Sequence, residues 1–271
     1  MTQTEKAIAF RALHDAPGAF LIANAWDAGS AKLLAGLGFK ALATSSGAKA
    51  GVLGRKDGQV TREEAAINAR TIVDATDLPV SADMEKGFGD TPMDAALTIA
   101  LGASVGLVGA SIEDATGDPS YPLMDIGLAA ERIAAAAQVA QGFGFPFLLT
   151  ARTENYLRGN PDLNDTIARL QAFEAAGADV LMAPGLPDLD AVRAVCSSVS
   201  KPVNFMAGIR GKSFTVPELA AAGVKRISLA TSLFRAAMTG AMNAAMEVRD
   251  HGTFSYLDGT MPTPDWNRFM T

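Results

Sequence analysis

A repeated alternation of short apolar runs with alanine-rich helical segments constrains the fold more than any other feature. We count eight such units along the 271 residues, and each apolar run has the length of a buried β-strand. The predicted strands span residues 20–26, 41–46, 79–83, 105–113, 146–152, 179–183, 202–206 and 226–230. Several of the intervening helices end at a glycine that leads directly into the next strand, as at Gly102, Gly177 and Gly223. This join is typical of a repeated βα unit, so the strands should run parallel.

Eight parallel βα units in a chain of this length predict an α/β fold, a (β/α)8 TIM-type barrel. A doubly wound open sheet is the alternative, because a strand count read from sequence is uncertain by one or two. An apolar fraction of 49% suffices for one large core. We expect one domain over residues 1–271, with residues 251–271, rich in aromatic and turn-forming residues, as a C-terminal tail.

Composition and charge exclude several classes of function. The net charge is −6, and no basic patch with interleaved aromatic residues occurs, which argues against a nucleic-acid partner. Neither a signal-peptide layout nor a membrane-spanning apolar run is present, so we expect a cytoplasmic protein with no membrane partner. The single cysteine, Cys196, cannot form an internal disulfide, and its helical setting predicts a buried, inert thiol. The histidines, His14 and His251, lie near the chain ends, where we expect surface positions.

Two acidic residues interrupt the apolar pattern at the end of the third predicted strand. Because side chains alternate along a strand, Asp83 and Glu85 should point to the same side, with their charges close together. Such a pair repels itself unless a cation or a proton intervenes. A structural ion pair with a nearby cation, for which Lys86 is a candidate, is the alternative to a metal site.

The predicted barrel indicates that these acids belong to an active site, since barrel enzymes build their sites from the carboxyl ends of strands. Glu113 closes the next strand and adds a third carboxylate to Asp83 and Glu85. Three carboxylates with no histidine or cysteine among them are a donor set that a hard cation prefers, so we predict Mg²⁺, with Mn²⁺ as a substitute. An ion-pair network with Arg152 and Lys86 remains the alternative.

Six motifs in this order resemble the isocitrate lyase and phosphoenolpyruvate mutase superfamily. They are Thr-Ser-Ser-Gly at 44–47, Asp-Gly at 57–58, Asp-x-Glu-x-Gly-Phe-Gly at 83–89, Ile-Glu-Asp at 112–114, Thr-Ala-Arg-Thr-Glu at 150–154 and Pro-Val-Asn at 202–204. The resemblance runs from about residue 20 to about residue 240. It implies a barrel, Mg²⁺, and a 2-oxo or 2-hydroxy carboxylate whose C–C or C–P bond is cleaved or formed through an enolate. It also implies a homotetramer that exchanges its last barrel helix, around residues 233–248.

The resemblance assigns roles to individual residues. Asp83 would hold Mg²⁺ directly or through water, while Glu85 and Glu113 would act through its water shell. Arg152 would bind a carboxylate or the developing enolate oxygen, for which its planar fork of N–H donors is suited. The other residues implied are Ser45, Ser46, Gly47 and Asn204 for substrate binding and Asp57 near the metal and the reacting group.

Residues 115–125 depart from the superfamily pattern. The lyases carry a catalytic cysteine in this loop and the mutases carry Lys and Asn-Ser, but none of these residues is present here. Tyr121, Asp118 and Asp125 are the only loop groups able to donate, accept or shuttle a proton, and Tyr121 either serves catalysis or packs the loop down. The Gly, Pro, Ser and Asp content predicts a mobile lid. The Ser-rich continuation that follows the seventh-strand Asn in the lyases is also absent after Asn204.

These observations predict a Mg²⁺-dependent enzyme that cleaves a C–C bond next to a 2-oxo or 2-hydroxy carboxylate, as a lyase, decarboxylase or acyl hydrolase. Two alternatives remain open. One is a P–C phosphomutase, and the other is a non-catalytic member of the superfamily that binds a carboxylate.

Overall fold

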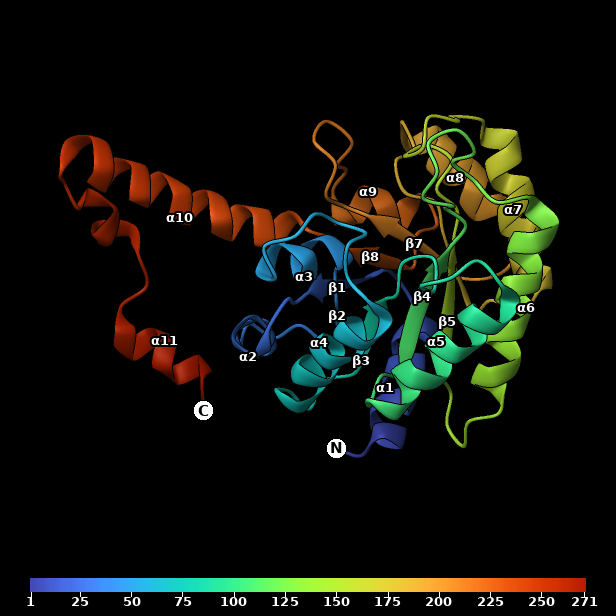
Figure 1. Cartoon of the computed structure of the whole chain (residues 1–271), viewed down its shortest axis with the longest axis horizontal. Coiled ribbons are helices and arrows are strands. Elements are labelled where there is room, and N and C mark those ends of the chain that lie inside the picture. Colours follow the sequence, from blue (N-terminus) through green and yellow to red (C-terminus); the bar gives the residue numbers. More distant parts are fainter.

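Eight parallel strands form a closed barrel in the computed structural model, which describes all residues 1–271 (Figure 1). Neighbours in sequence are neighbours in the barrel, and β8 closes it by pairing with β1. The strands are β1 (Phe20–Asn24), β2 (Leu42–Ala43), β3 (Val80–Asp83), β4 (Gly109–Glu113), β5 (Leu148–Arg152), β6 (Val180–Met182), β7 (Val203–Met206) and β8 (Arg226–Ser228). The predicted (β/α)8 barrel is confirmed, although most strands are shorter than predicted. The fourth begins at Gly109 rather than at residue 105, because Gly106 turns the chain with a φ of 95°.

Capping residues mark where helices around the barrel begin, and the spacing of apolar residues sets which face of each helix is buried. They are α2 (Ala28–Gly36), α3 (Ser46–Val52), α4 (Arg62–Asp74), α5 (Pro92–Ser104), α6 (Ile126–Gln141), α7 (Leu163–Ala175), α8 (Leu189–Ser198) and α9 (Val216–Ala221). Thr61 and Thr91 cap α4 and α5, each with an acid three residues later that binds back to the cap. On α6, Ala129, Ile133 and Ala136 recur at helical spacing and are buried. Small side chains on this face let the helix lie close to its neighbours.

Helix α1 (Gln3–Asp15) lies across the amino-terminal end of the barrel. Its Phe10 is fully buried in an apolar cluster with Ile22 of β1 and Leu148 of β5. His14, on the same helix, is also buried, with its ring edge-on to Phe10 and Phe20. The expected surface position of His14 is therefore wrong, because the helix packs this residue against the first strand.

The last helix, α10 (Ser232–His251), projects from the barrel and has no buried residue (Figure 1). Met238, Met242 and Met246 are exposed at intervals of four residues, which places them along one side of the helix. The chain then returns through η1 (Ser255–Gly259) and α11 (Thr263–Phe269) to α2. There the Phe269 ring lies directly over Gly36.

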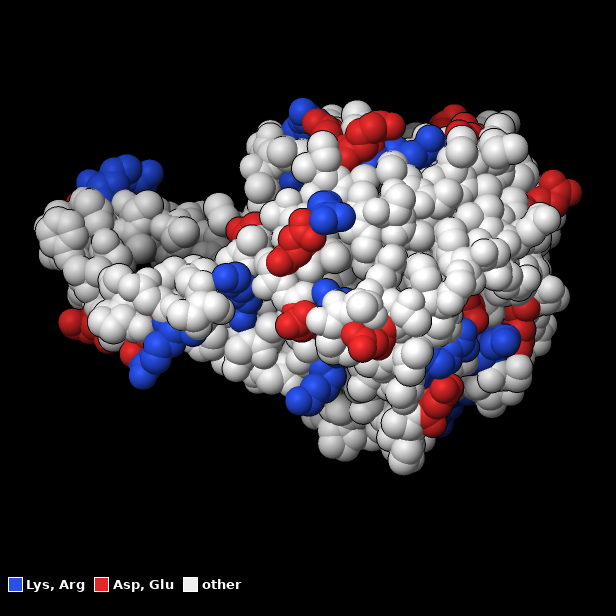
Figure 2. Space-filling model, turned by 90° about the horizontal axis from the view of Figure 1, so that it is seen from below, with Lys and Arg blue, Asp and Glu red and all other residues white.

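Charged side chains of both signs are scattered over the face of the molecule shown in Figure 2. The projecting arm formed by residues 232–271 is largely uncharged in that view, with charges mainly near its end and lower edge. No helix in the chain combines the length and the apolar character needed to cross a membrane.

Candidate active site

The polar residues predicted at the strand ends lie on three adjacent strands. Asp83 is the last residue of β3, Glu113 the last of β4 and Arg152 the last of β5. Glu113 and Arg152 pair in register, and Glu113 Oε2 lies 3.5 Å from Arg152 Nε. The barrel thus brings acids and a guanidinium together at its carboxyl-terminal rim.

Asp83 is held by backbone N–H groups. Its Oδ2 accepts a hydrogen bond from Ser46 N at 3.2 Å, and its Oδ1 accepts one from Glu85 N at 3.1 Å. Burial opposes the charged form, but the Arg152 guanidinium and these two N–H groups hold the pKa of Asp83 below its usual value. Asp83 is therefore a carboxylate at neutral pH.

Glu85 reaches the site by a different route from the one the sequence predicts. Strand β3 ends at Asp83, and Glu85 has a left-handed backbone with a φ of 52°. The prediction that alternation along the strand places both acids on one side is therefore wrong in its geometry. Glu85 nevertheless lines one cavity with Asp57, Glu113 and Arg152.

The cation beside Glu85 is Lys49, and not Lys86. Lys86 donates to Asp90 Oδ1 at 2.6 Å and to the carbonyl of Thr116 at 2.7 Å. Lys49 is buried on α3, with Nζ 3.8 Å from Glu85 Oε1. Sequence reasoning missed Lys49, although a lysine three residues after Ser46 on an otherwise small-residue segment was a usable signal.

Burial also raises the pKa of two site carboxyls. The pKa of Glu85 rises to about 7, because burial outweighs the opposing effect of Lys49. Burial raises the pKa of Glu113 to about 8 against the opposing effect of Arg152. Buried Glu85 Oε1 also has no hydrogen-bond partner. The site therefore holds an acceptor that the protein itself leaves unsatisfied.

Arg152 combines a fixed end with a free end. Its Nε donates to Glu154 Oε1 at 2.6 Å, and the charges of Glu113 and Glu154 raise its pKa against the effect of burial. Neither Nη1 nor Nη2 takes part in a hydrogen bond within the protein. Arg158 Nη2 lies 3.5 Å from Glu113 Oε1. The ion-pair network considered above thus exists around Arg152 and Arg158 but does not include Lys86, and the terminal N–H groups of Arg152 remain available to a ligand.

The segment after β2 also borders the site, because Ser46 lines the same cavity as Glu85 and Glu113. The Ser45 side chain caps α3 by accepting a hydrogen bond from Ala48 N at 3.4 Å. A Cβ on Gly47 would lie 3.2 Å from Asp57 Oδ2 and 2.8 Å from Thr231 Cγ2. A larger residue at position 47 would therefore require Thr231 to move, and Asp57 lies at the edge of the same cavity.

Asn204 lies below the rim, inside the barrel. It is buried, its Nδ2 donates to Ser228 Oγ at 3.0 Å, and its Oδ1 accepts from Arg226 Nε at 2.8 Å. Both ends of the amide are thus occupied by neighbouring side chains. Arg226 was not among the residues predicted for the site.

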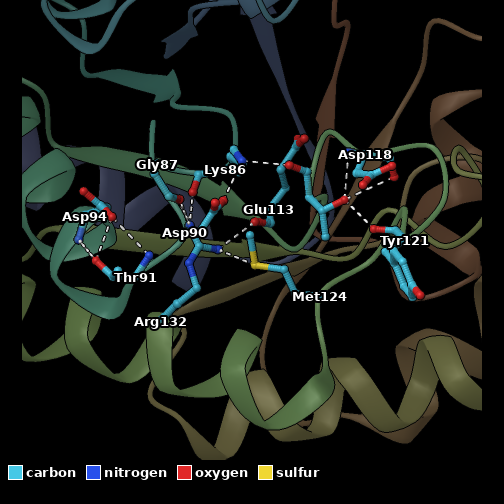
Figure 3. Close-up of polar contacts among 12 residues, drawn as sticks. Lys86, Gly87, Asp90, Thr91, Asp94, Glu113, Asp118, Tyr121, Met124 and Arg132 are labelled. Carbon is cyan, nitrogen blue, oxygen red and sulfur yellow. Dashed lines mark hydrogen bonds and ion pairs between the residues drawn. The ribbon is translucent and has the colours of Figure 1, made fainter.

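The loop that follows Glu113 does not bring Tyr121 to the acids. Ala115 bridges Leu123, and Thr116 N donates to the carbonyl of Pro122 at 3.1 Å, so the two ends of the loop are paired. Tyr121 is 75% exposed, and Figure 3 shows its ring directed away from Glu113. A role for this hydroxyl in catalysis requires the loop to move.

A buried arginine fastens the loop that carries Glu85 to the strand that carries Glu113 (Figure 3). Arg132 of α6 donates to the carbonyl of Gly89 at 2.9 Å, to that of Glu113 at 3.3 Å and to that of Lys86. These bonds fix the spacing between the ends of β3 and β4. Nothing in the sequence distinguished Arg132 from a surface arginine.

The donor set fits a hydrated Mg²⁺ better than a fully protein-bound metal. No three His, Cys, Asp or Glu side chains converge closely enough to hold a metal ion between them. Mg²⁺ usually keeps several waters and uses one or two carboxylates. Charged Asp83 and Glu85, whose Oε1 accepts no hydrogen bond, are the carboxylates that would hold such an ion.

An eight-stranded parallel barrel with acids and a guanidinium at its carboxyl-terminal rim has the architecture of the (β/α)8 enzymes. The model of the phosphoenolpyruvate phosphomutase family matches residues 10–249. The chain therefore belongs to this family, within the isocitrate lyase and phosphoenolpyruvate mutase superfamily, as its motifs predict.

Three relatives illustrate the range of the family. A crystal structure from Burkholderia cenocepacia J2315, provisionally described as a lyase/mutase, is 50% identical, with a TM-score of 0.97 over 98% of this chain and 96% of that one. The 2-methylisocitrate lyase of Escherichia coli K12 is 29% identical over 94% of this chain and 88% of its own. An oxaloacetate acetylhydrolase, solved with its product oxalate, is 25% identical, with a TM-score of 0.87 over 99% of this chain and 94% of that one.

Replacing Glu85 with glutamine should reduce the pH dependence of stability in the metal-free protein. Because the folded-state pKa of about 7 lies above the ordinary value of 4.5, the folded protein binds this proton more tightly than the unfolded chain does. The resulting stability is complete below pH 4.5 and is lost as the pH rises through 7. Urea unfolding of wild type and Glu85→Gln across this range should show a shallower decline in the variant. Part of the decline in stability should persist in the variant, because the pKa of Glu113 is also raised. Equally steep declines in the two proteins would contradict the raised pKa of Glu85.

Proposed function

We propose that this protein is a Mg²⁺-dependent enzyme that cleaves a C–C bond of a 2-oxo or 2-hydroxy carboxylate through an enolate. The observation that carries the proposal is the free edge of the Arg152 guanidinium beside the carboxylate of Asp83. A guanidinium whose two terminal NH2 groups are unused suits a ligand with two oxygens. The named relatives include a lyase and an acetylhydrolase, whose names describe the cleavage of organic acids.

The residues present can divide the work between them. Bound Mg²⁺ would supply a Lewis acid for the negative charge that develops on the C2 oxygen. Asp83, with Glu85 and Glu113 acting through water, would hold the cation. Arg152 binds the substrate carboxylate or the enolate oxygen, and Gly47 N–H, in the first turn of α3, has no partner within the helix.

The absence of a loop cysteine narrows the chemistry. Cys196 cannot replace it, because this residue lies on α8 against Gly223 and burial raises the pKa of its thiol to about 11. A reaction whose leaving fragment needs no protonation by a thiol fits best. Loss of CO₂ from oxaloacetate and hydrolytic removal of an acyl group both meet this condition. The family model carries the name of a phosphomutase, which keeps P–C chemistry as the second candidate.

Metal binding should depend on Asp83. Titration calorimetry with Mg²⁺ or Mn²⁺ should show binding to the wild type and a loss of at least about tenfold in affinity for Asp83→Ala, because a charged ligand is removed. Asp90→Ala is the matched control, since Asp90 is an exposed acid on the same loop. Equal affinities in the wild type and Asp83→Ala would rule out this metal site.

Arg152→Lys should lose most of kcat, by about a hundredfold, because a point charge replaces a fork that binds two oxygens. The assay follows pyruvate, glyoxylate or oxalate released from a panel of 2-oxo and 2-hydroxy dicarboxylates with Mg²⁺. Cys196→Ser is the control and should keep the wild-type rate. If Cys196→Ser were inactive with unchanged fold and metal affinity, the assignment of the chemistry to the site around Arg152 would be wrong.

We also propose that α10 is exchanged between subunits of a homo-oligomer, a tetramer or a dimer of dimers. The support is that α10 has no buried residue and that Met238, Met242 and Met246 form an exposed apolar stripe. Light scattering should give an oligomer for the wild type and smaller species for Met242→Asp. Asn243→Asp adds the same charge about 100° further round the helix and should leave the oligomer intact. A monomeric wild type at micromolar concentration would refute the exchange.

A further inference from the structure

Arg226 is a cation buried inside the barrel without an acidic partner. It is 5% exposed, its Nε donates to Asn204 Oδ1 at 2.8 Å, and its Nη2 donates to Thr150 Oγ1 at 2.8 Å. The third contact, between Nη1 and His14 Nε2, is long at 3.5 Å. A guanidinium has five N–H donors, so at least two have no partner here. Burial lowers the pKa of Arg226 to about 9, and no acidic group opposes this effect.

His14 cannot supply the missing negative charge. Its Nδ1 lies 2.9 Å from the carbonyl of Phe10, so Nδ1 carries the hydrogen and Nε2 accepts from Arg226. Burial and the nearby Arg226 lower the pKa of His14 to about 3, so the ring is neutral. Asn204 and Thr150 are neutral as well. A buried charge without a partner of opposite sign destabilises the folded protein, and an anion beside Arg226 would offset this effect.

A cavity connects Arg226 with the rim of the barrel. Its volume is about 50 Å³, and Asp83 and Arg152, the last residues of β3 and β5, also line it. One water needs roughly 10–15 Å³ of such space, so the cavity can hold a group larger than a single water. Hydroxyl and amide groups supply most of the polar lining, from Asn24, Thr44, Ser81, Ser111, Asn204 and Ser228.

The two guanidinium groups lie at successive levels of the barrel. Arg226 contacts Thr150, which lies two residues before Arg152 on β5. Two residues of strand span roughly 7 Å, so Arg226 lies about one layer of side chains below the level of Arg152. A four-carbon dicarboxylate carries its two charges at opposite ends of a short chain, and such a chain matches two cations placed one layer apart.

We propose that the barrel interior beneath Arg152 is a carboxylate subsite, in which the distal carboxylate of a four-carbon dicarboxylate substrate binds Arg226. This assignment rests on the proposed function, because it takes the head of the substrate to be held at Arg152. The same chemistry could come from a small free anion such as formate. Arg226 is then a specificity-determining residue that favours dicarboxylates over monocarboxylates.

The test compares two ligands that differ only at the distal group. Malate has a carboxylate where 2-hydroxybutyrate has a methyl group, and both keep the same 2-hydroxy acid head. Calorimetry in the presence of Mg²⁺ should show that Arg226→Met weakens malate binding by about thirtyfold or more, because a buried cation that pairs with the ligand is lost. The affinity for 2-hydroxybutyrate should change by less than about threefold. Equal losses for the two ligands would make Arg226 a structural residue and overturn the proposal.

A second variant guards against misfolding of Arg226→Met. Asn204→Asp places a carboxylate at the atom that already accepts from Arg226 Nε, so it should neutralise the cation and raise the melting temperature. It should also weaken malate selectively. Unchanged malate affinity in a folded Asn204→Asp protein would contradict the subsite.

A melting experiment with formate distinguishes failure of this subsite from failure of the proposed function. If the wild type binds neither hydroxy acid, the proposed function fails. A melting temperature that formate raises in the wild type, but not in Arg226→Met, would then still support an anion subsite. A third outcome is that formate stabilises the protein through Arg226 while malate and 2-hydroxybutyrate bind with equal affinity. This outcome would assign the cavity to a free anion and overturn the role of Arg226 in substrate selection. If formate does not change the melting temperature and malate binds no more tightly than 2-hydroxybutyrate, neither an anion subsite nor a role of Arg226 in substrate selection remains.

Discussion

Compensation of negative charge at the ends of β3 and β4 is the constraint on which the site depends. Asp83, Glu85 and Glu113 all lie in this region, and like charges repel strongly where little water screens them. Each acid has its own partners: Asp83 accepts two backbone N–H groups, Glu85 lies beside a buried ammonium, and Glu113 lies between two guanidinium groups. Each acid therefore already has a cation or N–H donors beside it, and a metal ion that binds there would share or displace these partners.

The same constraint explains the shape of the loop after β3. Glu85 and Phe88 both adopt positive φ angles, a conformation that costs non-glycine residues free energy and persists only where neighbours enforce it. Here the enforcement comes from side chains that bind the loop carbonyls. Arg132 binds those of Lys86 and Gly89, and Thr98 binds that of Gly87 at 2.7 Å. The strained loop keeps Glu85 near the other acids although the strand has already ended.

The parts of the structure that depend on local pattern could be predicted, and those that depend on long-range contacts could not. Strand periodicity and the glycine joins sufficed for the barrel, and its topology brought the ends of β3, β4 and β5 together. Lys49 was missed because its burial depends on where α3 begins, and that helix starts at Ser46, inside the segment predicted as the second strand. Arg132 and Arg226 were missed because a charged residue in a helix or strand shows no sign of burial in sequence, and only packing reveals it. Alternation failed for Glu85 because nothing local marks Asp83 as the last residue of the strand.

The closure of the barrel has a consequence for how the chain can be made. Strand β1 pairs with β2 on one side, but its other edge stays unpaired until β8 is available. In the closed barrel Phe20 of β1 pairs with Arg226 of β8. Until almost the whole chain has left the ribosome, the nascent sheet carries two open edges whose backbone groups can pair with another chain. Such sequence-distant pairing is slow to form and exposes partly folded chains to aggregation. Helix α1 precedes every strand in the chain and packs on Ile22 of β1, so it is available to cover apolar surface before the barrel closes.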